Sequence, residues 1–238
     1  LAAGLGPRLG RPLPKPLTAL EDGRTIMQQQ MDNLRAAFGD DHRVLVVVGF
    51  KYEIVMETFP DVTFAYNEDY DQTNTNRSLL KALRLTHPDQ GVLWMNGDVV
   101  FDPAILHALA PVIRDDRTAV CVNTAKTAEE EVKYTVDDRG LVRELSKTVT
   151  GALGEAIGIN YVAGKDKATL VKHLADCCVG LRPGTFNCQR DCSVPRFTVE
   201  GAECLLSLSC EQLVARGLCD IPDPANESFG DAGQPQCR

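Results

Sequence analysis

The chain of 238 residues is long enough for an α/β domain with a sizeable core, and its 44% hydrophobic and 24% charged content is ordinary for a globular protein. A formal net charge of −8 argues against general nucleic-acid binding, because phosphate backbones call for a basic surface. The sequence contains neither an apolar run of about 18 residues nor a basic-then-apolar leader. It therefore predicts a cytoplasmic protein that binds neither membranes nor nucleic acid.

Strand-like and helix-like patterns alternate through the first half of the chain. Continuous apolar runs such as Val44–Val48 are typical of strands buried on both faces, and apolar residues spaced three and four apart indicate helices. Strands are expected at residues 1–4, 44–48, 62–66, 91–96 and 118–123, and helices at 25–38, 51–59, 76–86 and 103–114. This alternation predicts an α/β fold with a doubly wound, mixed but mostly parallel sheet that binds ligands at the carboxyl ends of its strands.

The pattern changes after residue 125. Two strand-like segments at 132–136 and 141–145 flank the polar turn Asp137-Asp138-Arg139-Gly140, which predicts a β-hairpin insertion. One more strand at 158–163 and one more helix at 165–175 follow.

The chain opens with L-A-A-G-L-G-P-R-L-G-R-P-L-P-K-P-L. Gly4 and Gly6 allow a tight turn whose N–H groups approach a ligand, and Arg8, Arg11 and Lys15 add three cations to an otherwise acidic chain. Backbone donors and clustered cations together favour a polyphosphate site. The alternative is a glycine turn with only a structural role, since a lone G-x-G is a weak signal.

These residues resemble the signature L-A-A-G-x-G-x-R followed by P-K-P-L of the sugar-nucleotidyltransferase superfamily, whose fold is Rossmann-like and related to that of GT-A glycosyltransferases. The resemblance implies that Arg8 lies on the β- and γ-phosphates and that Lys15 neutralises charge near the reacting phosphates, both as catalytic residues. Because residue 1 already reads as the end of a strand, the first strand is expected to be truncated at its N-terminus. The expected nucleotide-binding residues of this loop are Leu1, Ala2, Ala3, Gly4 and Gly6.

Asn96-Gly97-Asp98 follows a buried strand, at the edge where α/β sheets bind ligands. Magnesium usually takes one or two protein carboxylates together with phosphate oxygens, so Asp98 is the expected Mg²⁺ ligand and Gly97 a nucleotide-binding neighbour. The resemblance places a metal-binding aspartate at this strand end as well. The alternative is that Asp98 caps a turn or the next helix.

The expected reaction is nucleotidyl transfer: a phosphate oxygen of a small metabolite attacks the α-phosphorus of a nucleoside triphosphate, and pyrophosphate leaves. The attacking oxygen is already ionised, so positioning and charge neutralisation suffice and no general base is needed. Two alternatives remain: a nucleotide-binding protein of this fold without turnover, and a glycosyltransferase. The absence of D-x-D at residues 96–98 disfavours the glycosyltransferase.

Tyr66 begins a segment that resembles the Y-N-x-x-Y-x-x-T-N-x-x-x-S-L stretch of bacterial phosphocholine cytidylyltransferase-like enzymes. The resemblance implies that Asn74 lies beside the nucleotide base and that Lys147 and Glu155 bind the acceptor. The alternatives are a helix cap near Asn74 and a solvated hairpin face. The base (cytosine, uracil, thymine or guanine) and the acceptor (a phosphosugar, phosphocholine or similar phosphorylated molecule) stay open.

The resemblance covers residues 1–175, which are expected to form the nucleotidyltransferase domain. Of nine cysteines only Cys121 precedes residue 177, and the tail 176–238 is rich in cysteine and proline, with helical spacing only at 200–216. The family's second metal-binding aspartate has no clear counterpart, and Asp220 and Asp223 stand among prolines. The tail has three alternative interpretations: a metal site, a disulfide-rich segment, or a stretch outside the native reading frame.

Overall fold

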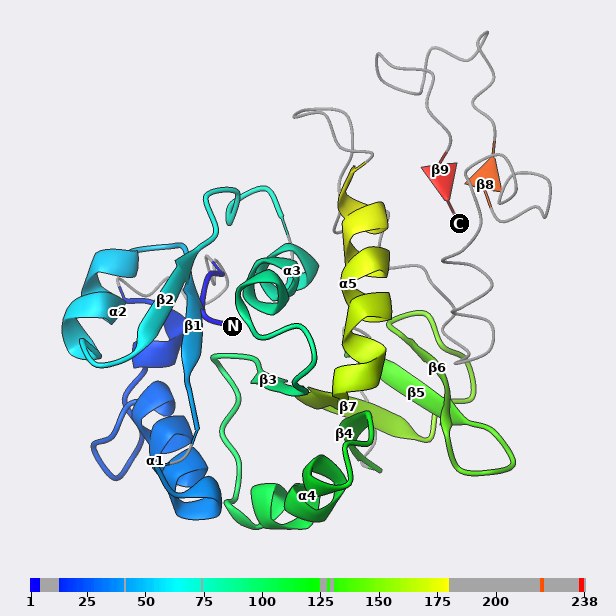
Figure 1. Cartoon of the computed structure of the whole chain (residues 1–238), viewed down its shortest axis with the longest axis horizontal. Helices are drawn as coiled ribbons and strands as arrows, with labels where there is room; N and C mark the ends of the chain where they lie inside the picture. Colours follow the sequence, from blue (N-terminus) through cyan, green and yellow to red (C-terminus); the bar gives the residue numbers. More distant parts are fainter. Residues whose placement is uncertain are drawn as a thin grey trace, which may run out of the picture. The chain divides into compact units, whose positions relative to one another are not determined.

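The structure is a computed structural model that describes residues 1–4, 13–40, 42–73, 75–124, 128, 131–179, 219–220 and 236–237. The chain divides into two compact units, Leu1–Cys121 with Ile157–Ala175, and Val122–Ala156 with Asp176–Arg238. The helices, labelled in Figure 1, are η2 (Lys15–Leu17, a 3-10 helix), α1 (Ile26–Phe38), α2 (Tyr52–Thr58), α3 (Thr75–Leu85), α4 (Ala104–Arg114) and α5 (Gly164–Val179). The strands are β1 (Leu45–Val48), β2 (Thr63–Tyr66), β3 (Val92–Met95), β4 (Ala119–Asn123), β5 (Lys133–Val136), β6 (Val142–Ser146), β7 (Gly154–Val162), β8 (Cys219–Asp220) and β9 (Gln236–Cys237).

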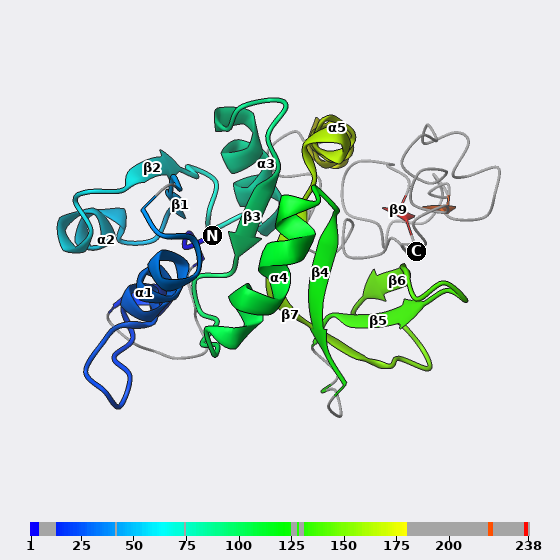
Figure 2. The same cartoon turned by 60° about the horizontal axis from the view of Figure 1, so that its bottom comes forward.

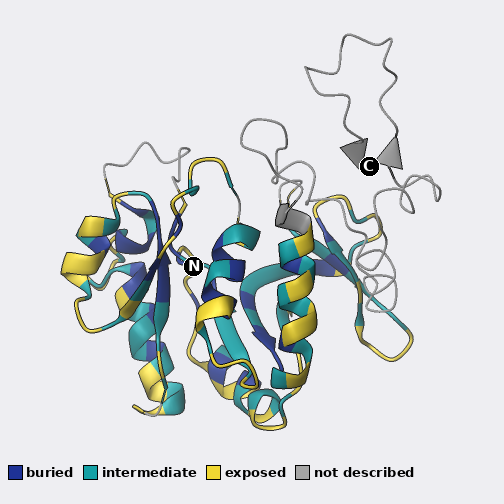
Figure 3. Cartoon of the chain, turned by 45° about the horizontal axis from the view of Figure 1, so that its top comes forward, coloured by how far each residue is buried: buried dark blue, intermediate teal, exposed yellow. Residues whose placement is uncertain are grey.

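In the first unit, β1 and β2 pair in parallel and are covered by helices on both faces. Val46 and Val48 pack with α1 and α2, whereas Val47 packs with Ala65 of β2 and Ala82 of α3. Successive residues of a strand point to opposite faces of the sheet. The continuous apolar run predicted from the sequence therefore provides apolar side chains to the core on both faces. Figure 3 shows β1 as a buried strand accordingly.

The first residues of the chain lie between β1 and β3. Ala2 donates its N–H to the Val47 carbonyl at 2.7 Å and forms a parallel bridge with Val48. The Leu1 nitrogen donates to the Met95 carbonyl at 2.7 Å, and Gly97 N–H donates to the Leu1 carbonyl at 2.8 Å. These bonds bring residues 3–4 and 97–98 to the same edge of the fold.

β3 is framed by β7 and α4. β7 pairs antiparallel with β3, and β4 also pairs with β7. A core cluster joins Met95 of β3, Ile159 of β7 and Leu106 and Leu109 of α4, which explains why α4 packs over this strand in Figure 2. β7 begins at Gly154, four residues before the predicted start at 158, and it passes through Gly158 with a φ of +79°.

In the second unit, β5 and β6 form the predicted hairpin, and β5 also pairs with the first residues of β7. β8 and β9 pair antiparallel, with Cys219 opposite Cys237. The helical pattern at 200–216 lies outside the described residues. The boundary proposed at residues 175/176 stays a prediction, and α5 continues across it to Val179.

The predicted fold class is confirmed: the chain has a mixed α/β, Rossmann-like fold with parallel pairing, helices on both faces and a β-hairpin insertion. The antiparallel pairs come from β7 and from the hairpin. Among the residues that the structure describes, no helix combines the length and apolar character needed to cross a lipid bilayer.

Candidate functional site

Lys15 and Asp98 face each other in the first unit. Lys15 Nζ donates a hydrogen bond to Asp98 Oδ2 at 2.9 Å, and both side chains are partly exposed, at 37% and 43%. Lys15 opens η2, in which Pro16 and Leu17 are buried, so the turn is anchored by its apolar residues while the lysine remains accessible. Asp98 lies in a turn directly after β3.

Gly97 is where three segments meet. A Cβ added to Gly97 would lie 2.9 Å from the Leu1 carbonyl oxygen, 2.9 Å from Pro16 Cγ and 3.2 Å from the Ala2 Cα. Only glycine allows this approach, so the chain start, the P-K-P-L turn and the N-G-D strand end form one structure. Of the predicted site, Leu1, Ala2, Lys15, Gly97 and Asp98 are thereby brought together.

Ala3 and Gly4 continue from this meeting point. Ala3 is buried, and its carbonyl accepts a hydrogen bond from Phe50 N–H at 3.1 Å. Gly4 is exposed, and a Cβ built on it would meet nothing within 4 Å. The chain thus reaches the surface at Gly4. Gly6 and Arg8, the other predicted residues of this loop, lie outside the described residues.

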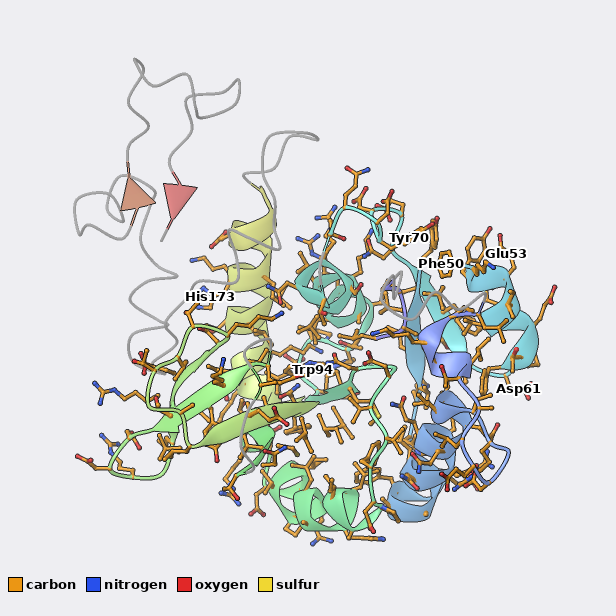
Figure 4. All side chains as sticks on the ribbon, turned by 180° about the vertical axis from the view of Figure 1, so that it is seen from behind. Phe50, Glu53, Asp61, Tyr70, Trp94 and His173 are labelled. Carbon is orange, nitrogen blue, oxygen red and sulfur yellow. The ribbon has the colours of Figure 1, made fainter. Side chains whose placement is uncertain are left out.

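The segment that follows β2 lies beside Ala3. A Cβ on Gly49, directly after β1, would lie 2.5 Å from Tyr70 Cβ and 2.6 Å from the Ala3 carbonyl oxygen. Figure 4 shows Phe50 and Tyr70 near each other at this end of β1. The polar segment that the sequence associates with the nucleotide base is therefore adjacent to Ala3.

Asn67 organises that polar segment and was not predicted as a site residue. It is only 1% exposed, and its Nδ2 donates to Ser78 Oγ at 3.1 Å and to Thr73 Oγ1 at 3.3 Å. Thr73 donates in turn to the Asp69 carbonyl at 2.6 Å, so its hydroxyl stabilises the loop. Asn74, the predicted base-side residue, lies outside the described residues.

Two acidic residues of this segment, Glu68 and Asp69, are paired with α3. Lys81 donates to Glu68 and holds the pKa of that carboxyl below its usual range, chiefly through this hydrogen bond. Arg77 forms an ion pair with Asp69 at 3.5 Å. Asp98, by contrast, is paired with Lys15 and lies next to Gly97, which contacts Leu1 and Ala2.

The donor set fits a divalent metal that arrives with a nucleotide. The described residues contain no group of three or more His, Cys, Asp or Glu side chains that could hold a metal by itself. Magnesium needs only one or two carboxylates when phosphate oxygens supply further ligands, and Asp98 provides one accessible carboxylate at the carboxyl end of β3.

The predicted acceptor residues lie in the second unit. Glu155 Oε1 accepts a hydrogen bond from Asn123 Nδ2 at 2.9 Å, and Lys133 is the direct cross-strand partner of Glu155 in the β5–β7 pair. Lys133 Nζ also donates to the Lys147 carbonyl at 3.0 Å, while the Lys147 side chain is exposed. Lys133 and Asn123 were not predicted, although a lysine in the otherwise neutral strand K-Y-T-V was a usable signal.

Comparisons with known proteins show the family and the fold of the chain. Residues 1–158 match the model of the MobA-like NTP transferase domain. The chain is 34% identical over 182 residues to CMP-5'-(3-aminopropyl)phosphonate synthase of Streptomyces rubellomurinus, a match that covers 73% of this chain and 25% of that protein. It is 30% identical over 124 residues to the bifunctional protein GlmU of Methylobacillus flagellatus, covering 52% of this chain and 26% of the relative. The chain thus spans about a quarter of the length of these curated relatives.

Solved structures share the fold. CTP:phosphocholine cytidylyltransferase from Streptococcus pneumoniae is 19% identical, with a TM-score of 0.57 and coverage of 75% of both chains. The inositol-1-phosphate CTP transferase from T. maritima is also 19% identical, with a TM-score of 0.57 and coverage of 70% of both chains. At these identities the likeness concerns the fold.

Proposed function

Because the chain belongs to the MobA-like NTP transferase family, we propose that it is a nucleotidyltransferase that joins a nucleoside triphosphate to a small phosphorylated metabolite and releases pyrophosphate. The observation that carries this proposal is the Lys15–Asp98 pair at the edge where residues 1–4 meet Gly97. A cation for phosphate and a carboxylate for a metal lie beside Gly97, which contacts Leu1 and Ala2.

The chemistry asks for few groups from the protein. An oxygen of the acceptor's phosphate or phosphonate attacks the α-phosphorus, the bond from that phosphorus to the bridging oxygen breaks, and the electron pair leaves with pyrophosphate. Lys15 neutralises negative charge at the reacting phosphates, and Arg8 does the same at the β- and γ-phosphates. The N–H groups from Ala3 to Gly6 hold the triphosphate in line for attack.

We propose Mg²⁺ as the divalent metal and Asp98 as the residue that would hold it. The ion supplies neutralisation of phosphate charge and fixes the geometry of the triphosphate. The Lys15–Asp98 contact is compatible with this role, because an exposed ion pair contributes only about 0–1 kcal/mol and is readily exchanged for phosphate and metal.

CTP is the nucleotide we propose, with a small phosphonate or phosphate as acceptor. The support is the relative named as a CMP-aminopropylphosphonate synthase, which is 34% identical over 73% of this chain. Glu155 and Lys147 of the second unit are proposed to bind the acceptor. Glu155 is suited to a cationic amine or a hydroxyl, and Lys147 to the phosphonate or phosphate itself.

The test is pyrophosphate release by the purified chain with each of the four nucleoside triphosphates and Mg²⁺. The acceptor panel holds 3-aminopropylphosphonate, phosphocholine, inositol 1-phosphate and sugar 1-phosphates, with matched reactions lacking acceptor as controls. We expect acceptor-dependent pyrophosphate with CTP, and the nucleotidylated product by mass spectrometry.

Two other outcomes identify other functions. Metal-dependent CTP binding without pyrophosphate from any acceptor would favour a binding protein of this fold. The observation in favour of this second candidate is that the described residues contain no group of three or more His, Cys, Asp or Glu side chains that could hold a metal. Hydrolysis of a nucleotide-sugar in place of pyrophosphate release would point to a glycosyltransferase.

A further inference from the structure

Two buried amide side chains of α1 bind the backbone of the segment that carries Asp98. Gln30, 5% exposed, donates through Nε2 to the carbonyl oxygens of Asn96 at 2.9 Å and Val99 at 2.8 Å. Asn33, 7% exposed, donates through Nδ2 to the Phe101 carbonyl at 3.0 Å. Residues three apart lie on one side of a helix, so α1 presents both amides to the same stretch of backbone.

Gln30 closes the turn in which Asp98 sits. Val99 N–H donates to the Asn96 carbonyl at 3.3 Å, so residues 96–99 form a hydrogen-bonded turn with Asp98 at its third position. The Gln30 amide nitrogen bonds to the carbonyls at both ends of this turn. The turn is therefore held across its base by a single side chain, while the carboxylate is left free of that contact.

Packing alone does not account for an amide at this position. The same helix buries Ile26 and Met27, and an aliphatic side chain at position 30 would avoid the cost of desolvating an amide. The amide is useful only where its donors meet acceptors at fixed places. Gly97, between the two bonded carbonyls, is also fixed by its contacts with Leu1 and Pro16.

We propose that Gln30 is a positioning residue for Asp98: it fixes the turn so that the carboxylate meets the divalent metal of the bound nucleotide, and Asn33 extends this support to Phe101. The proposal rests on the proposed function of the site. Partners that orient a metal ligand typically change metal affinity or activity by about 10- to 100-fold when removed. If Gln30 has this role, its replacement should change the metal dependence of nucleotide binding by a factor of that size without a matching change in stability.

The experiment measures CTP affinity of the full chain by isothermal titration calorimetry, once with MgCl₂ and once with EDTA. The ratio of the two affinities is the gain due to metal. In Gln30→Met, which removes both donors at similar volume, we expect the gain to fall by about 10- to 100-fold while metal-free affinity is unchanged. Gln30→Asn keeps an amide that is too short to reach both carbonyls, and its loss should be intermediate.

Lys167→Met is the matched control. Lys167 is 2% exposed and donates through Nζ to Thr86 Oγ1 at 2.9 Å, to the Gln90 carbonyl at 3.1 Å and to the His87 carbonyl. Lys167 thus binds the backbone just before the amino end of β3. Asp98 follows the opposite, carboxyl end of the same strand. Replacement of Lys167 should lower the urea midpoint and leave the metal gain intact.

An unchanged metal gain in both Gln30 variants would overturn the positioning role, and so would an equal loss in Lys167→Met. Unfolding of both Gln30 variants under conditions where Lys167→Met stays folded would make Gln30 a folding determinant and also overturn it. If the unaltered chain shows no metal gain for CTP, the proposed function fails first. That result is distinguishable from the others because it needs no variant.

Discussion

Lys15 Nζ and Asp98 Oδ2 lie 2.9 Å apart although 83 positions separate the two residues in the chain. The contact depends on the meeting of η2 with the turn after β3, which Gly97 permits by its lack of a side chain. Two opposite charges of a proposed phosphate and metal site thus neutralise each other, at the low energy expected of a half-exposed pair. Each can therefore be tested alone without a large effect on folding.

Asp98→Asn should lower kcat/KM for nucleotidyl transfer by at least about 100-fold, because it removes the carboxylate proposed to hold the metal while keeping the shape of the side chain. The measurement is initial pyrophosphate release against MgCl₂ concentration. Asp102→Asn is the control four residues away. Asp102 Oδ1 accepts from Ala104 N–H at 2.8 Å at the start of α4, and asparagine caps a helix as well as aspartate does. Equal losses in the two variants would contradict the metal assignment.

Lys15→Met should lower kcat by about 100-fold, since one preorganised charge aimed at the reacting phosphates is lost. Its free energy of unfolding should change by no more than about 1 kcal/mol, as expected for an exposed ion pair. Steady-state kinetics and urea titration measure the two effects separately. Lys172→Met, at an exposed position of α5, removes the same charge elsewhere and should leave kcat unchanged. A Lys15 variant with full activity would remove this residue from the site.

Gly97→Ala should lower the stability of the protein, whereas Gly4→Ala should lower only its affinity for the nucleotide. A Cβ at Gly97 would press on the Leu1 carbonyl and on Pro16 at 2.9 Å each, so this variant should lose stability by about 1–3 kcal/mol together with activity. A Cβ at Gly4 meets nothing within 4 Å, so that variant should keep its melting temperature and lose only affinity for the nucleotide, whose phosphates must approach the backbone. Thermal unfolding and CTP titration of both variants make the comparison; a destabilised Gly4→Ala would contradict it.

The elements that local pattern determines were predictable. The run Leu45–Val48 is apolar at every position because the strand is covered on both faces, and that composition is visible without a structure. The expectation that Lys15 and Asp98 serve one site came from the loop motif, the strand-end carboxylate and the family resemblance, but their direct contact was not predicted, since no spacing in the sequence brings residues 83 positions apart together.

Other features were missed for physical reasons. The strand expected at 158–163 begins at Gly154 in the structure, although glycine is disfavoured in strands. In the structure a Cβ on Gly154 would lie 1.8 Å from the Asn123 carbonyl oxygen, so glycine there permits close approach of backbone. Gln30 and Asn33 were not predicted as site residues, because the periodic pattern that identifies a helix is read from its apolar residues only. Their spacing of three residues, beside the apolar face of the helix, was the feature of the sequence that could have indicated two buried amides.

Tyr161→Phe should reveal a stabilising hydrogen bond that is lost at high pH. Burial, together with the hydrogen bond from its hydroxyl to Asp116 Oδ1 at 2.8 Å, raises the pKa of Tyr161 to about 12. Below about pH 10, where tyrosine titrates in an unfolded chain, folded and unfolded states both keep the proton and the contribution is intact. Between about pH 10 and 12 only the folded state keeps it, so stability falls as pH rises.

The variant should therefore be less stable than the unaltered chain by about 2 kcal/mol near neutral pH, as expected for a hydrogen bond to a charged group, and the difference should shrink above about pH 10. Urea unfolding of both proteins across that range measures it. Asp116 also accepts from Gly164 N–H at 2.9 Å, so the start of α5 keeps one anchor in the variant. A difference that stays constant with pH would contradict the raised pKa as the cause.

Glu155→Gln should raise the KM for the acceptor by about 10-fold or more, because a hydrogen bond to a charged group is worth about 1.5–3 kcal/mol. Glutamine keeps an oxygen for Asn123 Nδ2, so the local contact at 2.9 Å survives and the change is one of charge. Glu144→Gln is the matched control in the same unit, on β6, where Glu144 Oε2 accepts from Thr135 Oγ1 at 3.2 Å. Metal-dependent CTP binding should be unchanged in both, since neither carboxylate belongs to the Lys15–Asp98 site. The acceptor assignment fails if the two variants shift KM alike, because a general loss of negative charge in the second unit would then explain the result.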